Sequence, residues 1–84
     1  MPVGQKLEEA RKSKGVSLRE VSESTKIRGD YLSAIESGNY QISLPEVYLR
    51  GFVRLYAKFL GLDQDAMVSE LNLELGKPGE KNIK

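Results

Sequence analysis

Residues 46–60, EVYLRGFVRLYAKFL, decide how this chain folds. Plotted on a helical wheel of about 100° per residue, they give two separate rows of apolar side chains. One row consists of Leu49, Val53, Tyr56 and Leu60. A second row, roughly 100° away, consists of Tyr48, Phe52, Leu55 and Phe59. A helix at the edge of a small domain needs one apolar row to contact the core. This helix is therefore either central to the domain or keeps one row for a partner.

The first, mainly aliphatic row is expected to anchor the helix, and the second row to be at least partly accessible. Protein interfaces favour Tyr, Phe and Arg, which are frequent on the outer parts of this helix. Arg50, Arg54 and Lys58 share a third line and are expected to rim the contact. The alternative is that the second row also belongs to the core. Gly51 costs about 1 kcal/mol relative to alanine inside a helix, which predicts close approach by the last helix or by a partner.

Helix signals on both sides of this stretch predict an all-α, five-helix domain over residues 1–75. Ser17 and Glu20 have the spacing of a capping box, and Gly15 that of a left-handed helix end. Ile27 is expected to fill the angle between two helices. The expected helices span residues 5–14, 18–24, 28–37, 45–60 and 64–75, after a short lead-in at residues 1–4. Gly, Pro and charged residues dominate from residue 76 to 84, which predicts a flexible tail or linker.

The composition excludes several classes of function. With 13 basic and 12 acidic residues, the 84-residue chain is less basic than a domain that binds nucleic acid mainly through phosphate contacts. It contains neither Cys nor His, so a structural zinc site or a familiar nucleophile–base pair cannot be built. We therefore expect no enzyme, metal or cofactor. No apolar run approaches the roughly 18 residues of a membrane span, which predicts a soluble, cytoplasmic chain.

Two adjoining stretches carry a family resemblance. Residues 17–40, SLREVSESTKIRGDYLSAIESGNY, resemble the phage-repressor-like (Xre-type) helix-turn-helix family, including the closing I-E-x-G of Ile35, Glu36 and Gly38. Residues 44–63, LPEVYLRGFVRLYAKFLGLD, are similar to the fourth-helix signature of the cytoplasmic domain of the RodZ family of bacterial cell-shape proteins. The resemblance extends over residues 4–75.

This resemblance implies a non-enzymatic cytoskeletal adaptor. RodZ-like proteins carry such a domain at the N-terminus, inside the cell, ahead of a basic stretch and one span of the inner membrane. The domain binds the actin-like filament protein MreB through aromatic residues of the fourth helix. An anionic membrane surface would be reached only through a C-terminal span that this sequence lacks. The expected partner-binding residues are Tyr48, Phe52, Leu55, Phe59, Arg50 and Arg54.

The alternative is a sequence-specific DNA-binding regulator that places the helix at residues 28–37 in the major groove. The candidate DNA-binding residues are Lys26, Arg28, Asp30 and Ser33. A groove-reading helix needs long hydrogen-bond donors, whereas several positions of this one hold small side chains. Asp30 and Glu36 would also place negative charge where phosphates approach. We therefore favour a scaffolding role for the helix-turn-helix.

Overall fold

The computed structural model describes residues 1–41 and 44–76, and these residues form five α-helices and no strand. The helices are α1 (Val3–Ser13), α2 (Leu18–Thr25), α3 (Gly29–Glu36), α4 (Glu46–Phe59) and α5 (Gln64–Glu74). The all-α, five-helix prediction is confirmed. Residues 77–84, in the expected tail, lie outside the described residues.

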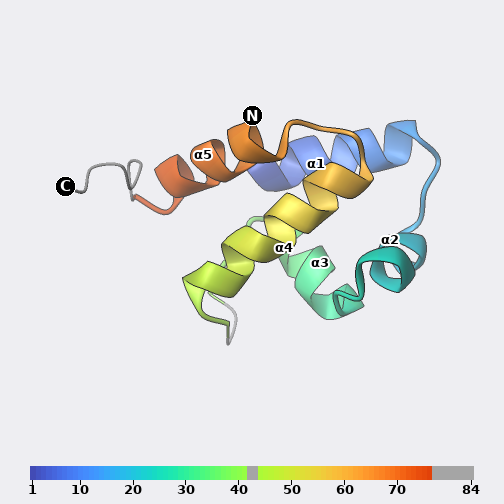
Figure 1. Ribbon diagram of the computed structural model, residues 1–84, viewed down its shortest axis with the longest axis horizontal. Helices are drawn as coiled ribbons and strands as arrows, with labels where there is room; N and C mark the ends of the chain where they lie inside the picture. The colour runs from blue at the N-terminus through green and yellow to red at the C-terminus, as the bar shows by residue number, and fades with distance from the viewer. Residues whose placement is uncertain (42–43, 77–84) are drawn as a thin grey trace.

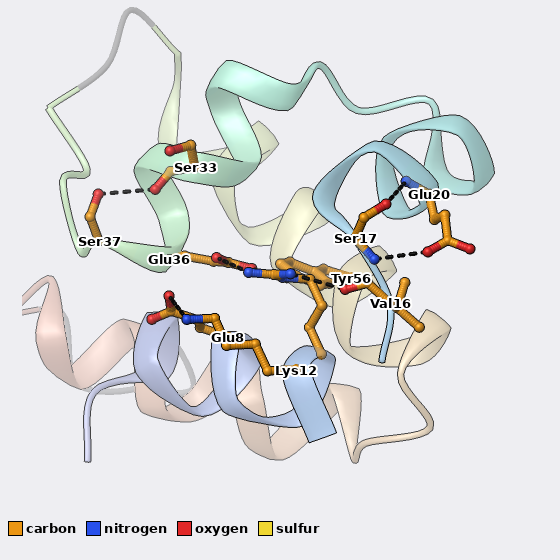
Figure 2. A network of polar contacts seen from close by, with 10 residues as sticks. Glu8, Lys12, Val16, Ser17, Glu20, Ser33, Glu36, Ser37 and Tyr56 are labelled. Carbon is orange, nitrogen blue, oxygen red and sulfur yellow. Dashed lines mark hydrogen bonds and ion pairs between the residues drawn. The ribbon is translucent and has the colours of Figure 1, made fainter. Parts of the chain in front are cut away.

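Local sequence signals set the ends of the helices. The Ser17 side chain accepts a hydrogen bond from the Glu20 amide over 3.1 Å, and the Glu20 carboxylate accepts one from the Ser17 amide over 2.8 Å (Figure 2). The predicted capping box is thus present. Gly15 has a φ of +69°, and the next amide, that of Val16, donates to the carbonyl of Arg11 over 3.2 Å. This pattern is a Schellman cap, which needs a residue that tolerates positive φ.

Helix α4 runs diagonally across the view in Figure 1 and packs mainly against α5, with further contacts to α2. Its contribution to the buried core is Leu49, Val53, Tyr56 and Ala57, followed by Leu60 at its C-terminal cap. The first apolar row therefore faces the core, as predicted. Ile27, at 2% exposure, belongs to the same core and lies between α2 and α3, which confirms its expected place.

The start of the chain is part of the fold, and the expectation of a lead-in at residues 1–4 was wrong. Val3 is fully buried, and its amide donates to the Glu74 carboxylate of α5 over 2.6 Å. Gly4 packs so closely on α3 that an added Cβ would lie 2.1 Å from the carbonyl oxygen of Ile35. The domain therefore has a glycine-dependent close contact, and it lies between α1 and α3.

Gly51, unlike Gly4, has no close neighbour at the place of its missing side chain. A Cβ added there would meet no atom within 4 Å. The expected close approach of the last helix to Gly51 is therefore wrong, because α5 packs on a different side of α4. The remaining explanation from the sequence, close approach by a partner, concerns atoms outside this chain.

Candidate functional site

The second apolar row of α4 lies at the surface. Tyr48 is 58% exposed, Leu55 46% and Phe59 38%. Phe52, the fourth member, is partly buried against the core. We call these four residues the aromatic row. Its expected partial accessibility is confirmed, while its role in binding a partner stays a prediction.

A stack of side chains extends the aromatic row onto α3. The rings of Phe52 and Tyr31 lie with their centroids 5.8 Å apart and their planes tilted by 37°. The guanidinium carbon of Arg28 lies 5.0 Å from the centroid of the Tyr31 ring, within cation–π range. The sequence placed Tyr31 on the apolar side of its helix and did not pair it with Phe52. The start of α3 thus adds a ring to the edge of the row, with the guanidinium of Arg28, which is also paired with Asp30, over that ring.

The two arginines expected at the partner contact lie on the flank of α4 that faces α5. Arg50 donates from Nε to Oδ1 of the buried Asn72 over 2.7 Å and pairs with Glu46 over 3.5 Å. Arg54 forms an ion pair with Asp65 at the start of α5. The structure therefore separates these arginines from the side of the helix that carries Phe52. Lys58 is exposed and forms no ion pair with any other described residue.

The four residues proposed to read DNA are exposed, and two of them, Arg28 and Asp30, contact each other. Arg28 makes a bidentate contact with Asp30, with nitrogen–oxygen distances of 2.8 and 3.2 Å, and also lies over the Tyr31 ring. Lys26 is exposed and adopts a φ of +66° as the C-terminal cap of α2. Ser33 is exposed on α3. The structure thus leaves Lys26 and Ser33 open, and holds Arg28 against its own helix.

Glu36 does not add negative charge to this surface, and the expectation that it would meet approaching phosphates was wrong. Its side chain is 7% exposed and accepts hydrogen bonds from Arg11 Nε over 2.7 Å and from Arg11 Nη2 over 3.1 Å. The Tyr56 hydroxyl of α4 also donates to it (Figure 2). The carboxylate is paired inside the domain and therefore unavailable to a ligand.

This buried network fixes α4, and with it the aromatic row, relative to α1 and α3. Burial raises the pKa of the Tyr56 hydroxyl, and its hydrogen bond to Glu36 raises it further. The same carboxylate raises the pKa of Arg11, so this side chain stays charged. Arg11 also donates to the Val16 carbonyl over 2.9 Å, which ties the α1–α2 connection to the network. Buried polar groups that are all satisfied favour one arrangement of the helices.

Two other kinds of site are missing from the described residues. No group of three His, Cys, Asp or Glu side chains in residues 1–41 and 44–76 is placed to hold a metal ion. Within the same residues, none of the helices has the length and apolar character needed to cross a membrane.

Comparison with known proteins agrees with the arrangement of the helices. The family model described as "Helix-turn-helix domain" matches residues 6–67. The chain is also 42% identical over 55 residues to the uncharacterized membrane protein YmfM of Bacillus subtilis (strain 168). That alignment covers 66% of this chain and 19% of the relative, so the chain spans about a fifth of the relative's length. No solved structure matches the chain significantly. Because the family match covers most of the sequence, including α2 and α3, this chain belongs to the helix-turn-helix domain family.

Proposed function

We propose that this domain is a non-enzymatic adaptor that binds another protein through the aromatic row of α4. One observation carries the proposal. The core-facing side of α4 is filled by its other apolar row, and yet Tyr48, Leu55 and Phe59 remain exposed on the same helix. Large apolar side chains that are exposed next to one another mark interaction surfaces, whereas single exposed ones are common on any protein. Aromatic side chains are also the usual anchors of protein–protein contacts.

The proposed partner is an actin-like filament protein of the MreB type, and the proposed role is bacterial cell-shape control. The resemblance of residues 44–63 to the fourth-helix signature of the RodZ family supports this choice. The match to a Bacillus membrane protein supports a place at the cytoplasmic face of a membrane. In this arrangement a span elsewhere in the full-length protein would hold the domain near the membrane, and α4 would reach the filament.

The side chains around α4 suit a docking surface. Phe52 is braced by Tyr31, so that ring loses little freedom when a partner covers it. Arg50 and Arg54 would act at the edge of the contact, where their α5 partners hold them. Lys58 would supply an exposed positive charge for steering an acidic partner.

A double substitution tests the proposal. Tyr48→Ala with Phe59→Ala removes two exposed rings without opening the core, so the melting temperature should stay close to that of the wild type. Co-sedimentation with purified MreB-type filaments should weaken by about tenfold or more, because buried aromatic anchors dominate interfaces. Leu73→Ala is the matched control, since Leu73 is 67% exposed on α5. Equal co-sedimentation of the double variant and the control would contradict the proposal.

The same domain can be tested for DNA binding. In the adaptor interpretation Arg28→Ala leaves filament binding intact, and the wild-type domain shows no sequence-selective retention of duplex DNA. Tight, selective DNA binding that Arg28→Ala removes, with a steep decline as salt rises, would instead establish the regulator.

A further inference from the structure

Gly51, which has no side chain, lies at the centre of the side of α4 that faces away from the core. It lies about 170° around the helical wheel from the centre of the buried row formed by Leu49, Val53, Tyr56 and Leu60. A Cβ added at Gly51 would meet no atom within 4 Å from another helix or from the side chains of the adjacent helical turns. Glycine is the least favourable residue in a helix interior apart from proline. Packing within the domain therefore gives no reason for glycine here.

Because Gly51 has no side chain and its neighbours on the helix do, we expect a depression in the helix surface there. The residues three and four positions away on either side are its neighbours on a helix; here they are Val47, Tyr48, Arg54 and Leu55. Val47 is 67% exposed, and Tyr48 and Leu55 also stand out into solvent. A small residue framed by large ones is the kind of hole into which a facing helix inserts a side chain, and it lets two helix backbones come close.

We propose that a helix of the partner crosses α4 at Gly51 and places an apolar side chain in this depression. The inference rests on the proposed function, and it adds which surface of α4 is contacted and what kind of element contacts it. The crossing would bring the partner onto Val47 as well as onto the aromatic row. It gives the glycine a role that the isolated domain does not.

Charge indicates the chemistry of the partner helix. Of the three basic residues of α4, Arg50 pairs with Glu46 and Arg54 with Asp65, which leaves Lys58 as the basic residue of this helix that has no carboxylate partner among the described residues. Lys58 follows Gly51 by seven positions, so it lies on the same side of the helix, and it pairs with no described carboxylate. The partner helix is therefore assigned carboxylates beside its apolar side chain. A second copy of this chain fits less well, because the one carboxylate of its α4, Glu46, already pairs with Arg50, so the two helices would bring two lysines together.

Substitutions at Gly51 test the inference because fold and binding should respond in opposite directions. Gly51→Ala fills open space with a better helix former and should raise the melting temperature by about 4–8 °C. The same substitution should weaken co-sedimentation with MreB-type filaments by about tenfold, and Gly51→Leu should abolish it. Ser69→Leu is the control, since it adds bulk to an exposed position of α5 and should leave binding unchanged.

The outcomes separate this inference from the proposed function. If Tyr48→Ala with Phe59→Ala abolishes filament binding while Gly51→Leu binds as the wild type does, the adaptor stands and the crossing at Gly51 is wrong. If the wild-type domain does not co-sediment, both are wrong. If the wild type dimerises in sedimentation equilibrium and Gly51→Leu is monomeric, the occupant is a second copy and the assignment of an acidic partner is overturned. Lys58→Glu should weaken filament binding most at low salt; unchanged binding would also overturn that assignment.

Discussion

Arg11 of α1 and Glu36 of α3 form a bidentate ion pair, with nitrogen–oxygen distances of 2.7 and 3.1 Å. Only 12% of the Arg11 side chain and 7% of the Glu36 side chain are exposed. Tyr56 of α4 donates a third hydrogen bond to the same carboxylate. Three helices that are distant in sequence therefore meet at one charged group, and α4 is positioned by it.

Glu36→Gln should destabilise the domain by about 3–5 kcal/mol, because it leaves the buried Arg11 charge without a counter-charge. The measurement is urea unfolding followed by circular dichroism. Glu23→Gln is the matched control. Glu23 pairs with Arg19 over 3.6 Å on the exposed side of α2, and loss of such a pair costs at most about 0.5 kcal/mol. Similar losses for the two variants would show that the buried pair is not a major support of the fold.

Gly4→Ala should lower the free energy of unfolding by about 1–3 kcal/mol or more, because the new methyl group overlaps backbone atoms of α3 that cannot move aside. The overlap involves the carbonyl oxygens of Ile35 and Glu36, at 2.1 and 2.7 Å. Gly29→Ala supplies the comparison, since a Cβ at Gly29 meets nothing within 4 Å. Its midpoint in urea should match or exceed that of the wild type. A neutral Gly4→Ala would mean that α1 shifts away from α3 at little cost.

Alkaline pH should weaken the fold through Tyr56. Because burial and Glu36 raise the pKa of this hydroxyl in the folded state, the unfolded chain loses its proton first, near pH 10. The stabilising contribution is complete below that pH and is lost as pH rises towards the folded-state pKa. The expected slope is about 1.4 kcal/mol per pH unit.

Urea midpoints measured from pH 8 to pH 11.5 test this slope. Tyr56→Phe should start from a lower stability at pH 8, because it loses the hydrogen bond to Glu36, and should then decline less steeply above pH 10. Some decline should remain, since burial and Glu74 raise the pKa of Tyr40 as well. Parallel curves for the wild type and Tyr56→Phe would exclude Tyr56 as the titrating group.

Ser17→Ala should destabilise the domain by about 0.5–2 kcal/mol, because it removes the side-chain acceptor for the Glu20 amide at the start of α2. The midpoint of thermal unfolding gives the measurement. Ser24→Ala, at an exposed position near the end of the same helix, should have a much smaller effect. If the two alanine variants melt together, the capping box does not limit the stability of α2.

Local patterns in the sequence were sufficient to predict the five helices. Each signal acts within a few residues: the capping box of Ser17 and Glu20, the cap at Gly15, and the periodic row that includes Leu49 and Val53. Periodicity showed that α4 carries two apolar rows, and the aliphatic row was expected to face the core because aromatic side chains are favoured at protein interfaces.

The tertiary contacts around the candidate surface were not predictable in the same way. The close contact of Gly4 depends on a carbonyl 31 positions later, and nothing near Gly4 in the sequence indicates it. Glu36 did carry a signal. It follows the buried Leu32 by four positions, so it lies on the inward side of α3, where a charged residue needs a partner. The stack of Tyr31 on Phe52 depends on how α3 and α4 cross, which periodicity does not determine.

The hydrogen bond from Arg50 to the buried Asn72 has a consequence for any association at α4. A long basic side chain on a free surface samples many rotamers, and immobilising it on binding costs about 0.5–1.5 kcal/mol. Arg50 has already lost that freedom when the domain folds, because α5 holds its guanidinium group in place. A ligand that covered this edge of the helix would meet a preorganised cation, and the entropic cost of ordering that side chain would be part of folding and not of binding.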